Sequence, residues 1–213
     1  RMVQDQEDVY YYLTVMNENY PHPAMPEGVE QDILKGMYAF RRGADDSKAP
    51  RVQLLGSGTI FNEVIAAAEM LKNDWGVESD LWSCPSFTEL AREGNDAARH
   101  NLLHPTEPAR LSHVESCLND TRGPVIASTD YIRTYADQIR PFVRGRYVAL
   151  GTDGYGRSDT REKLRHFFEV DRNWVTVAAL KALADEGTLP ATKVAEAIAK
   201  YNLDPNKPNP MTV

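Results

Sequence analysis

Residues 147–171, YVALGTDGYGRSDTREKLRHFFEVD, run from a short apolar segment through a glycine-rich loop into a charged amphipathic stretch. The segment 147–150 has the continuous apolar character of a strand buried in a parallel sheet. Gly151, Gly154 and Gly156 follow it, and glycine tolerates backbone angles that other residues resist. A strand, a glycine loop and a helix in this order commonly form a ligand site in α/β proteins. The stretch therefore predicts both a parallel sheet and the place of a possible site.

The rest of the chain repeats this alternation of apolar segments and amphipathic stretches. Apolar residues at 60, 61, 64, 65, 68 and 71, closed by Gly76, predict a helix over 60–75. The predicted strands are 37–42, 51–55, 77–84, 125–129 and 147–150. The predicted helices are 27–35, 60–75, 86–103 (with a break near Gly94), 110–118, 131–143, 160–169, 172–185 and 191–201.

This order predicts an α/β fold of three layers, with a mostly parallel sheet, helices on both faces and one antiparallel edge strand. Segments 37–42 and 51–55 are separated by the polar stretch GADDSKAP (43–50). We expect these two segments to form an antiparallel hairpin.

The N-terminal part has a different character. Residues 8–17 suggest a further strand that is apolar on both faces, as suits the sheet of another domain. Three prolines follow at positions 21, 23 and 26, and proline cannot continue a strand ladder. Because Arg1 precedes Met2 and the strand begins almost at once, we expect the chain to be cut from a longer protein.

Composition excludes several classes of function. The chain has 213 residues, 42% of them hydrophobic, which suits one well-buried core. A formal net charge of −7 without a basic stripe argues against nucleic-acid binding. No apolar run approaches the ~20 residues of a membrane-spanning helix, so no membrane association is expected. Cys84 and Cys117 lack metal-type spacing and indicate free thiols in a reducing cytoplasm.

The motif Gly56-Ser57-Gly58 lies between a predicted strand and a predicted helix, as in dinucleotide-binding proteins. Phe61 stands where the third glycine would be, so the motif is weak. We favour a tight turn in which Ser57 or Thr59 caps the helix. No phosphate-binding motif of nucleoside triphosphatases and no nucleophile elbow of hydrolases occurs in the sequence.

Among the five histidines, His100 and His104 have a spacing that would permit a metal site on a helix. No glutamate lies between them as in zinc proteases, and Pro105 follows directly. Solvated or interface histidines are the favoured reading. His166 is expected to pack beside Phe167 or Phe168.

Five stretches carry a resemblance that covers essentially the whole chain. They are EDVYYYLTVMNENYPHPAMPEG (7–28), VQLLGSGTI (52–60), SFTELAREGND (86–96), IASTDYIRTYADQIRPFV (126–143) and GTDGYGRSDTREKLRHFFEVD (151–171). Together they resemble the C-terminal, transketolase-like domain of the homodimeric bacterial pyruvate dehydrogenases. These enzymes are the thiamine-diphosphate-dependent decarboxylating components of the pyruvate dehydrogenase complex.

The resemblance implies a domain arrangement. Residues 1–20 would supply the last strand of the upstream pyrimidine-binding domain, and 21–27 would be a proline-rich linker. Residues 28–203 would form the C-terminal domain, and 204–213 a tail. The implied partners are the rest of the same chain, a second subunit in a homodimer, and the dihydrolipoyl acetyltransferase of the complex, in the cytoplasm.

The same resemblance implies a parent enzyme that decarboxylates pyruvate on thiamine diphosphate and Mg²⁺ and acetylates a lipoyl group. In this family the metal is held by an aspartate of a G-D-G motif and by a downstream asparagine. Thr152-Asp153-Gly154 only faintly matches the first, and VTVAALKALAD (175–185) has no asparagine. We therefore expect no catalytic, cofactor-binding or metal-binding residue within this chain, and no activity of the chain alone.

The loop after the last predicted strand remains the candidate for function. Its plain reading is a strand–helix connection in which Ser158 or Asp159 caps the helix. Its functional reading is a mobile loop at an active-site mouth or interface, with polar contacts from Asp153, Arg157 and Ser158. The alternative to an enzyme part is a stand-alone α/β module that binds an anion at 56–59 or 151–159, or an interaction scaffold.

Overall fold

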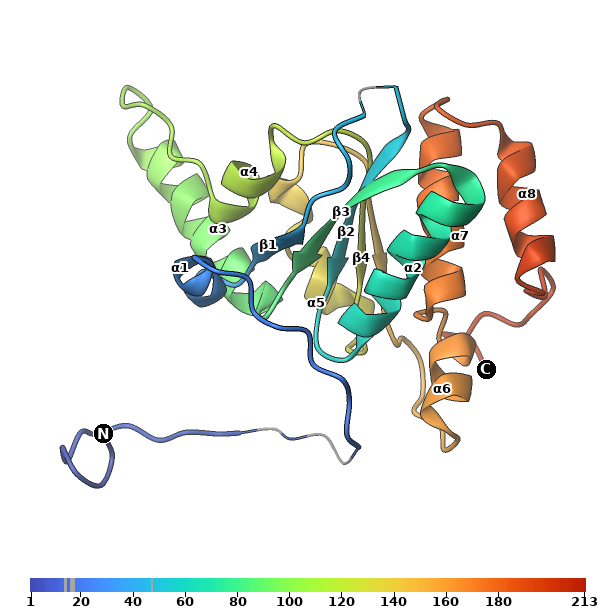
Figure 1. The fold of residues 1–213 in the computed structure, drawn as a ribbon. Coiled ribbons are helices and arrows are strands. Elements are labelled where there is room, and N and C mark those ends of the chain that lie inside the picture. Colours follow the sequence, from blue (N-terminus) through green and yellow to red (C-terminus); the bar gives the residue numbers. More distant parts are fainter. Residues whose placement is uncertain (14, 16–17, 47) are drawn as a thin grey trace.

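The computed structural model describes residues 1–13, 15, 18–46 and 48–213. Its centre is a five-stranded sheet in the order β1-β3-β2-β4-β5, in which four strands are parallel (Figure 1). Only β1, at one edge, runs antiparallel, to β3. The strands are β1 (Tyr38–Arg41), β2 (Arg51–Gly56), β3 (Glu78–Ser83), β4 (Val125–Ser128) and β5 (Tyr147–Leu150).

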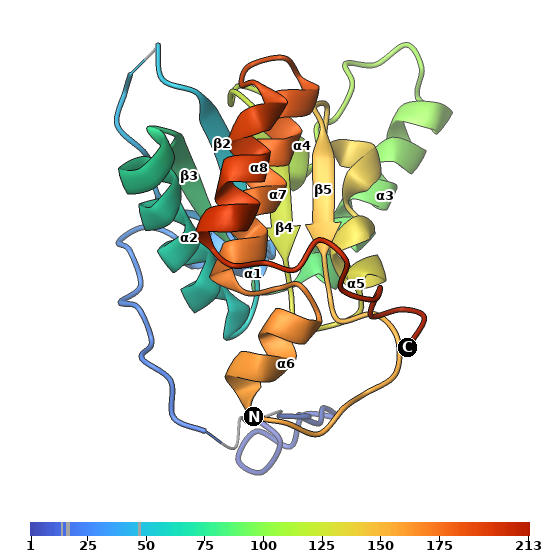
Figure 2. The same ribbon diagram turned by 90° about the vertical axis from the view of Figure 1, so that its right-hand side faces the viewer.

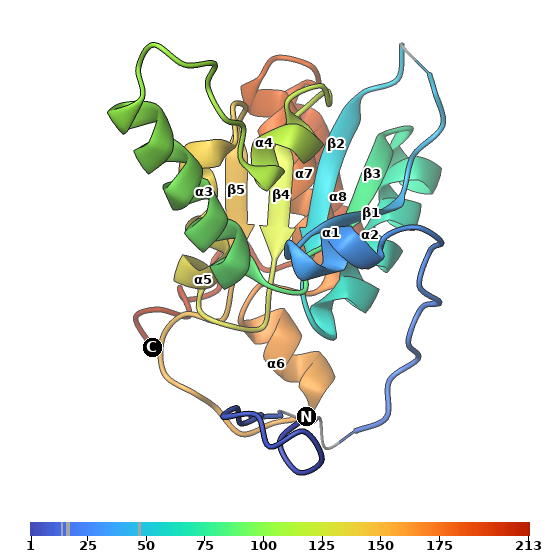
Figure 3. The same ribbon diagram turned by 90° about the vertical axis from the view of Figure 1, so that its left-hand side faces the viewer.

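Helices cover both faces of this sheet. One face carries α2 (Ile60–Trp75) and α7 (Arg172–Asp185), with α8 (Ala191–Lys200) packed on α7 (Figure 2). The opposite face carries α3 (Phe87–Leu103), α4 (His113–Leu118) and α5 (Arg133–Asp137) (Figure 3). The remaining helical segments are α1 (Glu30–Leu34), the 3-10 turn Arg140–Phe142 and α6 (Arg161–Phe167). The predicted three-layer α/β fold with one antiparallel edge strand is confirmed.

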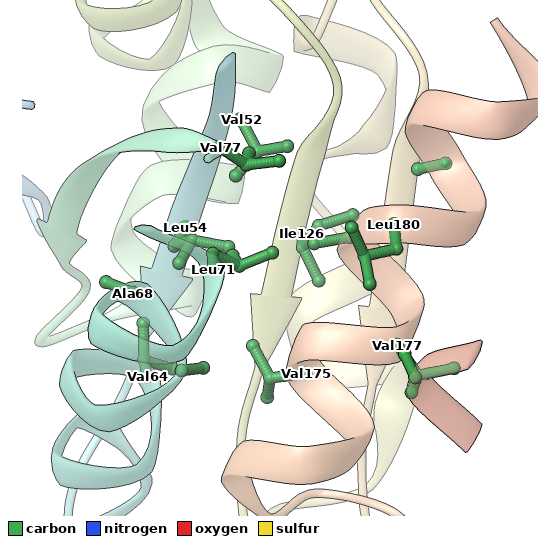
Figure 4. Close-up of a cluster of buried hydrophobic side chains, with 14 of the residues drawn as sticks. Val52, Leu54, Val64, Ala68, Leu71, Val77, Ile126, Val175, Val177 and Leu180 are labelled. Carbon is green, nitrogen blue, oxygen red and sulfur yellow. The ribbon is translucent and has the colours of Figure 1, made fainter. Parts of the chain in front are cut away.

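The alternation of side chains along the strands divides the core into two clusters. Leu54 and Ile126 face α2 and α7, where they meet Leu71 and Leu180 (Figure 4). Leu55, the neighbour of Leu54, points to the other face and joins the cluster under α3 and α4. Leu54, Leu55 and Leu71 are fully buried, and each such side chain stabilises the fold by ~1.5–3 kcal/mol. Continuous apolar strands are the sequence mark of a sheet buried on both faces.

The predicted hairpin between residues 37–42 and 51–55 is wrong. β1 pairs with β3, with Tyr38 opposite Ser83, so that β3 lies between β1 and β2. Asp80 of β3 fixes this arrangement, because its carboxylate accepts hydrogen bonds from Gly43 N at 2.9 Å and Arg51 Nη1 at 2.6 Å. The connection 43–50 is long enough that β1 and β2 need not be neighbours. Through Gly43 and Arg51, Asp80 holds the two ends of this connection beside β3.

Two helix predictions need correction on the α3 side of the sheet. Helix α3 runs without a break through Gly94, since this glycine lies directly under the Phe142 ring and allows close packing. The helix predicted over 131–143 is divided into α5 and a 3-10 turn. Pro141 lies at the start of that turn, where its missing N–H is tolerated, and it cannot continue an α-helix.

The N-terminal segment extends away from the domain (Figure 1). The described residues of 8–17 form no strand, and Tyr10, Tyr12 and Leu13 are each more than 80% exposed. Positions 14, 16 and 17 of the predicted strand lie outside the described residues. Backbone groups here have no neighbouring strand to pair with, so an extended ladder does not form. That this segment belongs to the sheet of another domain stays a prediction.

Within the described part of the chain, no helix is long and apolar enough to cross a membrane.

Candidate functional site

A cavity of about 250 Å³ with both polar and apolar lining residues opens at the carboxyl ends of three parallel strands. Thr59, Asp130 and Thr152 line it, and they follow β2, β4 and β5 respectively. Helix α6 lies beyond the arrowheads of β4 and β5 and forms the facing wall (Figures 2 and 3). Parallel strands bring the residues after their carboxyl ends to one edge of a sheet, which is where open α/β sheets bind ligands. The cavity thus joins both loops that the sequence singled out, 56–59 and 151–159.

Three arginines line this cavity: Arg157 from the loop, and Arg161 and Arg165 from α6. Arg161 and Arg165 are four residues apart and share a helix face. The Arg165 side chain is 16% exposed and its Nη2 donates to Thr59 Oγ1 at 3.2 Å. The Arg157 guanidinium lies over the Phe167 ring at 4.5 Å. The α6 side of the cavity therefore carries three guanidinium groups, of which Arg165 is paired with Glu63 and Arg161 with Glu18.

The predicted cap of the 60–75 helix is wrong. Thr59 occupies the N-cap position but makes no side-chain cap hydrogen bond. Its hydroxyl accepts from Arg165, and the Ser57 hydroxyl donates to Thr129 Oγ1 at 2.8 Å. Both hydroxyls thus bind other elements at the strand ends and leave the first N–H groups of α2 without a side-chain acceptor.

Within the loop, the cap of α6 is also different from the prediction. Thr160, not Ser158 or Asp159, accepts the N-cap bond, from Lys163 N at 3.4 Å. Asp159 Oδ1 accepts a hydrogen bond from Thr160 N at 2.8 Å, so Asp159 stabilises the N-cap residue from the position before the helix. Threonine at this position still satisfies one of the free amides of the first turn.

Asp153 holds the first part of the loop to α5. Its Oδ1 accepts from Arg133 N at 2.8 Å, and its Oδ2 lies 3.1 Å from Arg133 Nε. Gly151 permits this contact, because a Cβ there would lie 2.5 Å from Arg133 N. Gly154 has φ +95° and would place a Cβ 2.3 Å from Pro210 O, so the C-terminal segment closes against the loop.

Asp130 is the negative group inside the cavity. Burial raises the pKa of its carboxyl above the ordinary value, although the nearby Arg165 and Arg161 act in the opposite direction. A carboxylate here is poorly solvated, so its protonated form is more accessible than that of a surface aspartate.

The three predicted site residues therefore have different positions. Arg157 lines the cavity, Asp153 is bound to Arg133, and Ser158 is exposed in the loop without lining the cavity. The sequence reasoning missed Asp130 and Arg165. Asp130 could have been found as the polar residue just after strand 125–129, and Arg165 as one helical turn beyond Arg161.

The histidines do not form a metal site in the described residues. The His100 and His104 rings stack at 4.2 Å, and His100 Nε2 lies 3.7 Å from Glu107 Oε2. No group of three or more metal-ligating side chains occurs in the described parts of the chain. His166 Nδ1 lies 3.1 Å from Asp171 Oδ2, and the other oxygen of this carboxylate, Oδ1, caps α7.

The mostly parallel sheet, with helices on both faces and a cavity at the carboxyl ends of its strands, defines an α/β domain of the kind that binds ligands at this end of the sheet. Residues 36–171 match the family model of the transketolase-like TK C-terminal domain, and the chain belongs to this family. It corresponds to the transketolase-like C-terminal region of the bacterial pyruvate dehydrogenase E1 component.

Curated relatives match over nearly the full chain. A "Pyruvate dehydrogenase E1 component" from Cupriavidus necator is 78% identical over 213 residues, and one from Pseudomonas aeruginosa is 57% identical over 212. The chain covers 24% of the length of each of these two relatives. Among solved structures, transketolase from Leishmania mexicana matches 75% of this chain and 20% of its own, with a TM-score of 0.49 and 15% identity.

Proposed function

We propose that this chain acts as part of a pyruvate dehydrogenase that decarboxylates pyruvate on thiamine diphosphate and Mg²⁺. The acetyl unit then passes to a lipoyl group of the dihydrolipoyl acetyltransferase. The observation that carries the proposal is 78% identity across all 213 residues to a pyruvate dehydrogenase E1 component. The whole enzyme is proposed to be a cytoplasmic homodimer.

Within that enzyme we propose an architectural role for residues 28–203, with 1–20 in a neighbouring domain, 21–27 as linker and 204–213 as tail. Exposed apolar side chains support this role, since Tyr131, Ile132 and Tyr135 form an aromatic and aliphatic surface on α5 and the turn before it. Such a surface is typical of a contact with another domain or subunit. The loop bearing Asp153, Arg157 and Ser158 is proposed to lie at the active-site mouth.

A domain exchange tests this proposal. The matching region of the Cupriavidus necator protein is replaced by this chain, and pyruvate-dependent acetylation of a lipoyl domain is measured with thiamine diphosphate and Mg²⁺. We expect activity within a few-fold of the parent and an unchanged dimer in light scattering. As control, the matching domain of the Campylobacter jejuni transketolase, 20% identical to this chain, should give an inactive protein. A folded, dimeric exchange protein without activity would contradict the proposal.

The second candidate is a stand-alone anion-binding or interaction module, which the arginine-lined cavity favours. The mass of the native protein separates the two functions. A free module has the 23.9 kDa of this chain, whereas the enzyme part would be found in a far larger polypeptide.

A further inference from the structure

The cavity at the strand ends has two chemically different walls. Arg157, Arg161 and Arg165 supply guanidinium groups, whereas the half-buried Leu164 and Phe168 supply an apolar surface. Thr59 and Thr152 add hydroxyl groups at the strand ends. A small molecule with an anionic end and an apolar body would contact both walls at once.

The charge balance inside the cavity is positive. Asp130 is the acidic residue among those that line it, and it opposes three arginines. Glu63 lies behind Arg165, with its Oε1 3.4 Å from Arg165 Nη1, so it offsets part of that charge. The same carboxylate is also bound by Arg172 through its backbone N at 3.1 Å and its Nε at 2.8 Å. Glu18 approaches Arg161 from the rim at 3.6 Å, with its side chain 49% exposed, so that contact is weak. An anion entering the cavity would therefore be attracted, although the whole chain carries a net charge of −7.

The geometry favours phosphate over a single carboxylate. Guanidinium groups bind phosphate oxygens through paired, charge-assisted hydrogen bonds, and three of them match a dianion better than a monoanion. Thr59 Oγ1 accepts from Arg165, so its own hydroxyl proton remains available to a ligand oxygen. Arg157 lines the cavity, and its guanidinium also lies over the Phe167 ring at 4.5 Å, a cation–π contact that restricts its movement.

We infer that this cavity is a binding site for a small phosphate monoester whose organic part is apolar. Its phosphate would contact Arg157, Arg161 and Arg165, and its organic part Leu164 and Phe168. A cavity of about 250 Å³ is smaller than the ~300–1,000 Å³ of sites for drug-sized ligands, which favours a compact molecule. Binding of this ligand needs neither pyruvate nor thiamine diphosphate.

Calorimetric titration of the 213-residue chain with phenyl phosphate tests the inference, in the absence of thiamine diphosphate and at constant ionic strength. Phenyl phosphate combines the dianion with a compact apolar ring. We expect saturable binding with Kd below ~1 mM. Inorganic phosphate should bind at least several-fold more weakly because it leaves the apolar wall uncovered.

Matched variants assign the binding to the cavity. Arg157→Gln removes one guanidinium from an exposed loop and should weaken phenyl phosphate binding about tenfold. Arg144→Gln removes the same charge at the amino-terminal end of β5, the opposite edge of the sheet, and should leave the affinity unchanged. Asp130→Asn keeps the side-chain shape, removes the opposing charge and should tighten binding several-fold.

Three results would exclude this binding site or the role of its apolar wall. No saturable binding of phenyl phosphate, or an equal loss in Arg157→Gln and Arg144→Gln, would exclude a site in this cavity. Equal affinity for inorganic phosphate and phenyl phosphate would exclude the proposed role of the apolar wall. Circular dichroism of each variant confirms that the fold is retained. Because no cofactor or substrate is present, failure here leaves the proposed enzymatic function untouched.

Discussion

Glu63 on α2 and Arg172 at the start of α7 are joined by three hydrogen bonds. The carboxylate accepts from Arg172 N at 3.1 Å, Nε at 2.8 Å and Nη2 at 3.1 Å. Arg165 Nη1 lies 3.4 Å from the same carboxylate, so the pair also supports the wall of the cavity. Burial by itself would raise the pKa of Glu63, but the hydrogen bonds and charges of Arg172 and Arg165 hold it below the ordinary value.

Glu63→Gln should therefore lower the free energy of unfolding by about 1–3 kcal/mol at pH 7, as measured by urea denaturation. The folded-state pKa of Glu63 is depressed, so its contribution is present above the unfolded-state pKa and is lost as pH falls through the folded-state pKa. The difference between wild type and variant should accordingly shrink at acid pH.

A control for this change lies on the same helix. Glu69 pairs with Arg41 at 2.7 Å, but both side chains are about half exposed. Glu69→Gln should cost no more than ~0.5 kcal/mol. Equal losses in the Glu63 and Glu69 variants would contradict the assigned role of burial.

Gly94→Ala should destabilise the protein even though alanine favours helices. A Cβ at position 94 would lie 2.4 Å from the Phe142 ring, which is itself buried. We expect a loss of ~1–3 kcal/mol from overpacking, seen as a lower melting temperature. Phe142→Leu in the same chain should recover part of the loss, whereas Gly145→Ala, whose Cβ would meet nothing closer than 4.0 Å, should be nearly neutral. Additive losses in the double variant would contradict the steric account.

Gly94 also shows what the sequence could and could not predict. The sequence predicted the helix over 86–103, since helix formation depends largely on local residues, but it also predicted a break near Gly94 that α3 does not have. The close approach of Phe142 comes from a segment 48 positions further along the chain, and no local pattern reports it. The prediction of strand order was wrong for the same reason, because strand pairing depends on residues that are distant in the sequence. The hairpin prediction used sequence adjacency, while β1 is placed by contacts of Gly43 and Arg51 with Asp80.

The sequence predicted which loop borders the candidate site, but it did not predict which other residues line the cavity. The strand–loop–helix pattern located the loop that contains Arg157, and the cavity indeed lies there. Asp130 and Thr59 enter it from strands that are neighbours only in the folded sheet. Asp153 is a polar residue of the same glycine-rich loop as Arg157, but it binds Arg133 and does not line the cavity.

The two cysteines should differ sharply in reactivity. Burial raises the pKa of both thiols, to about 11 for Cys117 and further for the fully buried Cys84. Iodoacetamide at pH 8 should label Cys117 on the order of a hundredfold more slowly than a free cysteine, and Cys84 only after unfolding. Mass spectrometry of timed samples, with Cys117→Ser as control, measures both rates. Rapid labelling of Cys84 in the native protein would show that its side of the sheet opens readily.

The 213-residue chain alone should neither bind thiamine diphosphate nor decarboxylate pyruvate. Asp153, in the sequence that faintly resembles a metal-binding motif, is occupied by Arg133. Titration calorimetry with thiamine diphosphate and Mg²⁺ should show no binding at micromolar affinity, with the active domain exchange protein as positive control. A Kd in the micromolar range would refute this expectation.

Arg157→Ala in the full-length enzyme should lower turnover, through weaker affinity for pyruvate or for the lipoyl domain, by about tenfold. The melting temperature should change little, because a cation–π contact at an exposed site such as that with Phe167 contributes only ~0.5–1 kcal/mol. Asp153→Ala provides the contrast: it removes both contacts to Arg133, so its main effect should be a lower melting temperature. Steady-state kinetics and calorimetric melting of the two variants separate these roles. If Arg157→Ala instead lowers the melting temperature by several degrees with unaltered kinetics, Arg157 is a structural residue and this loop only connects β5 to α6.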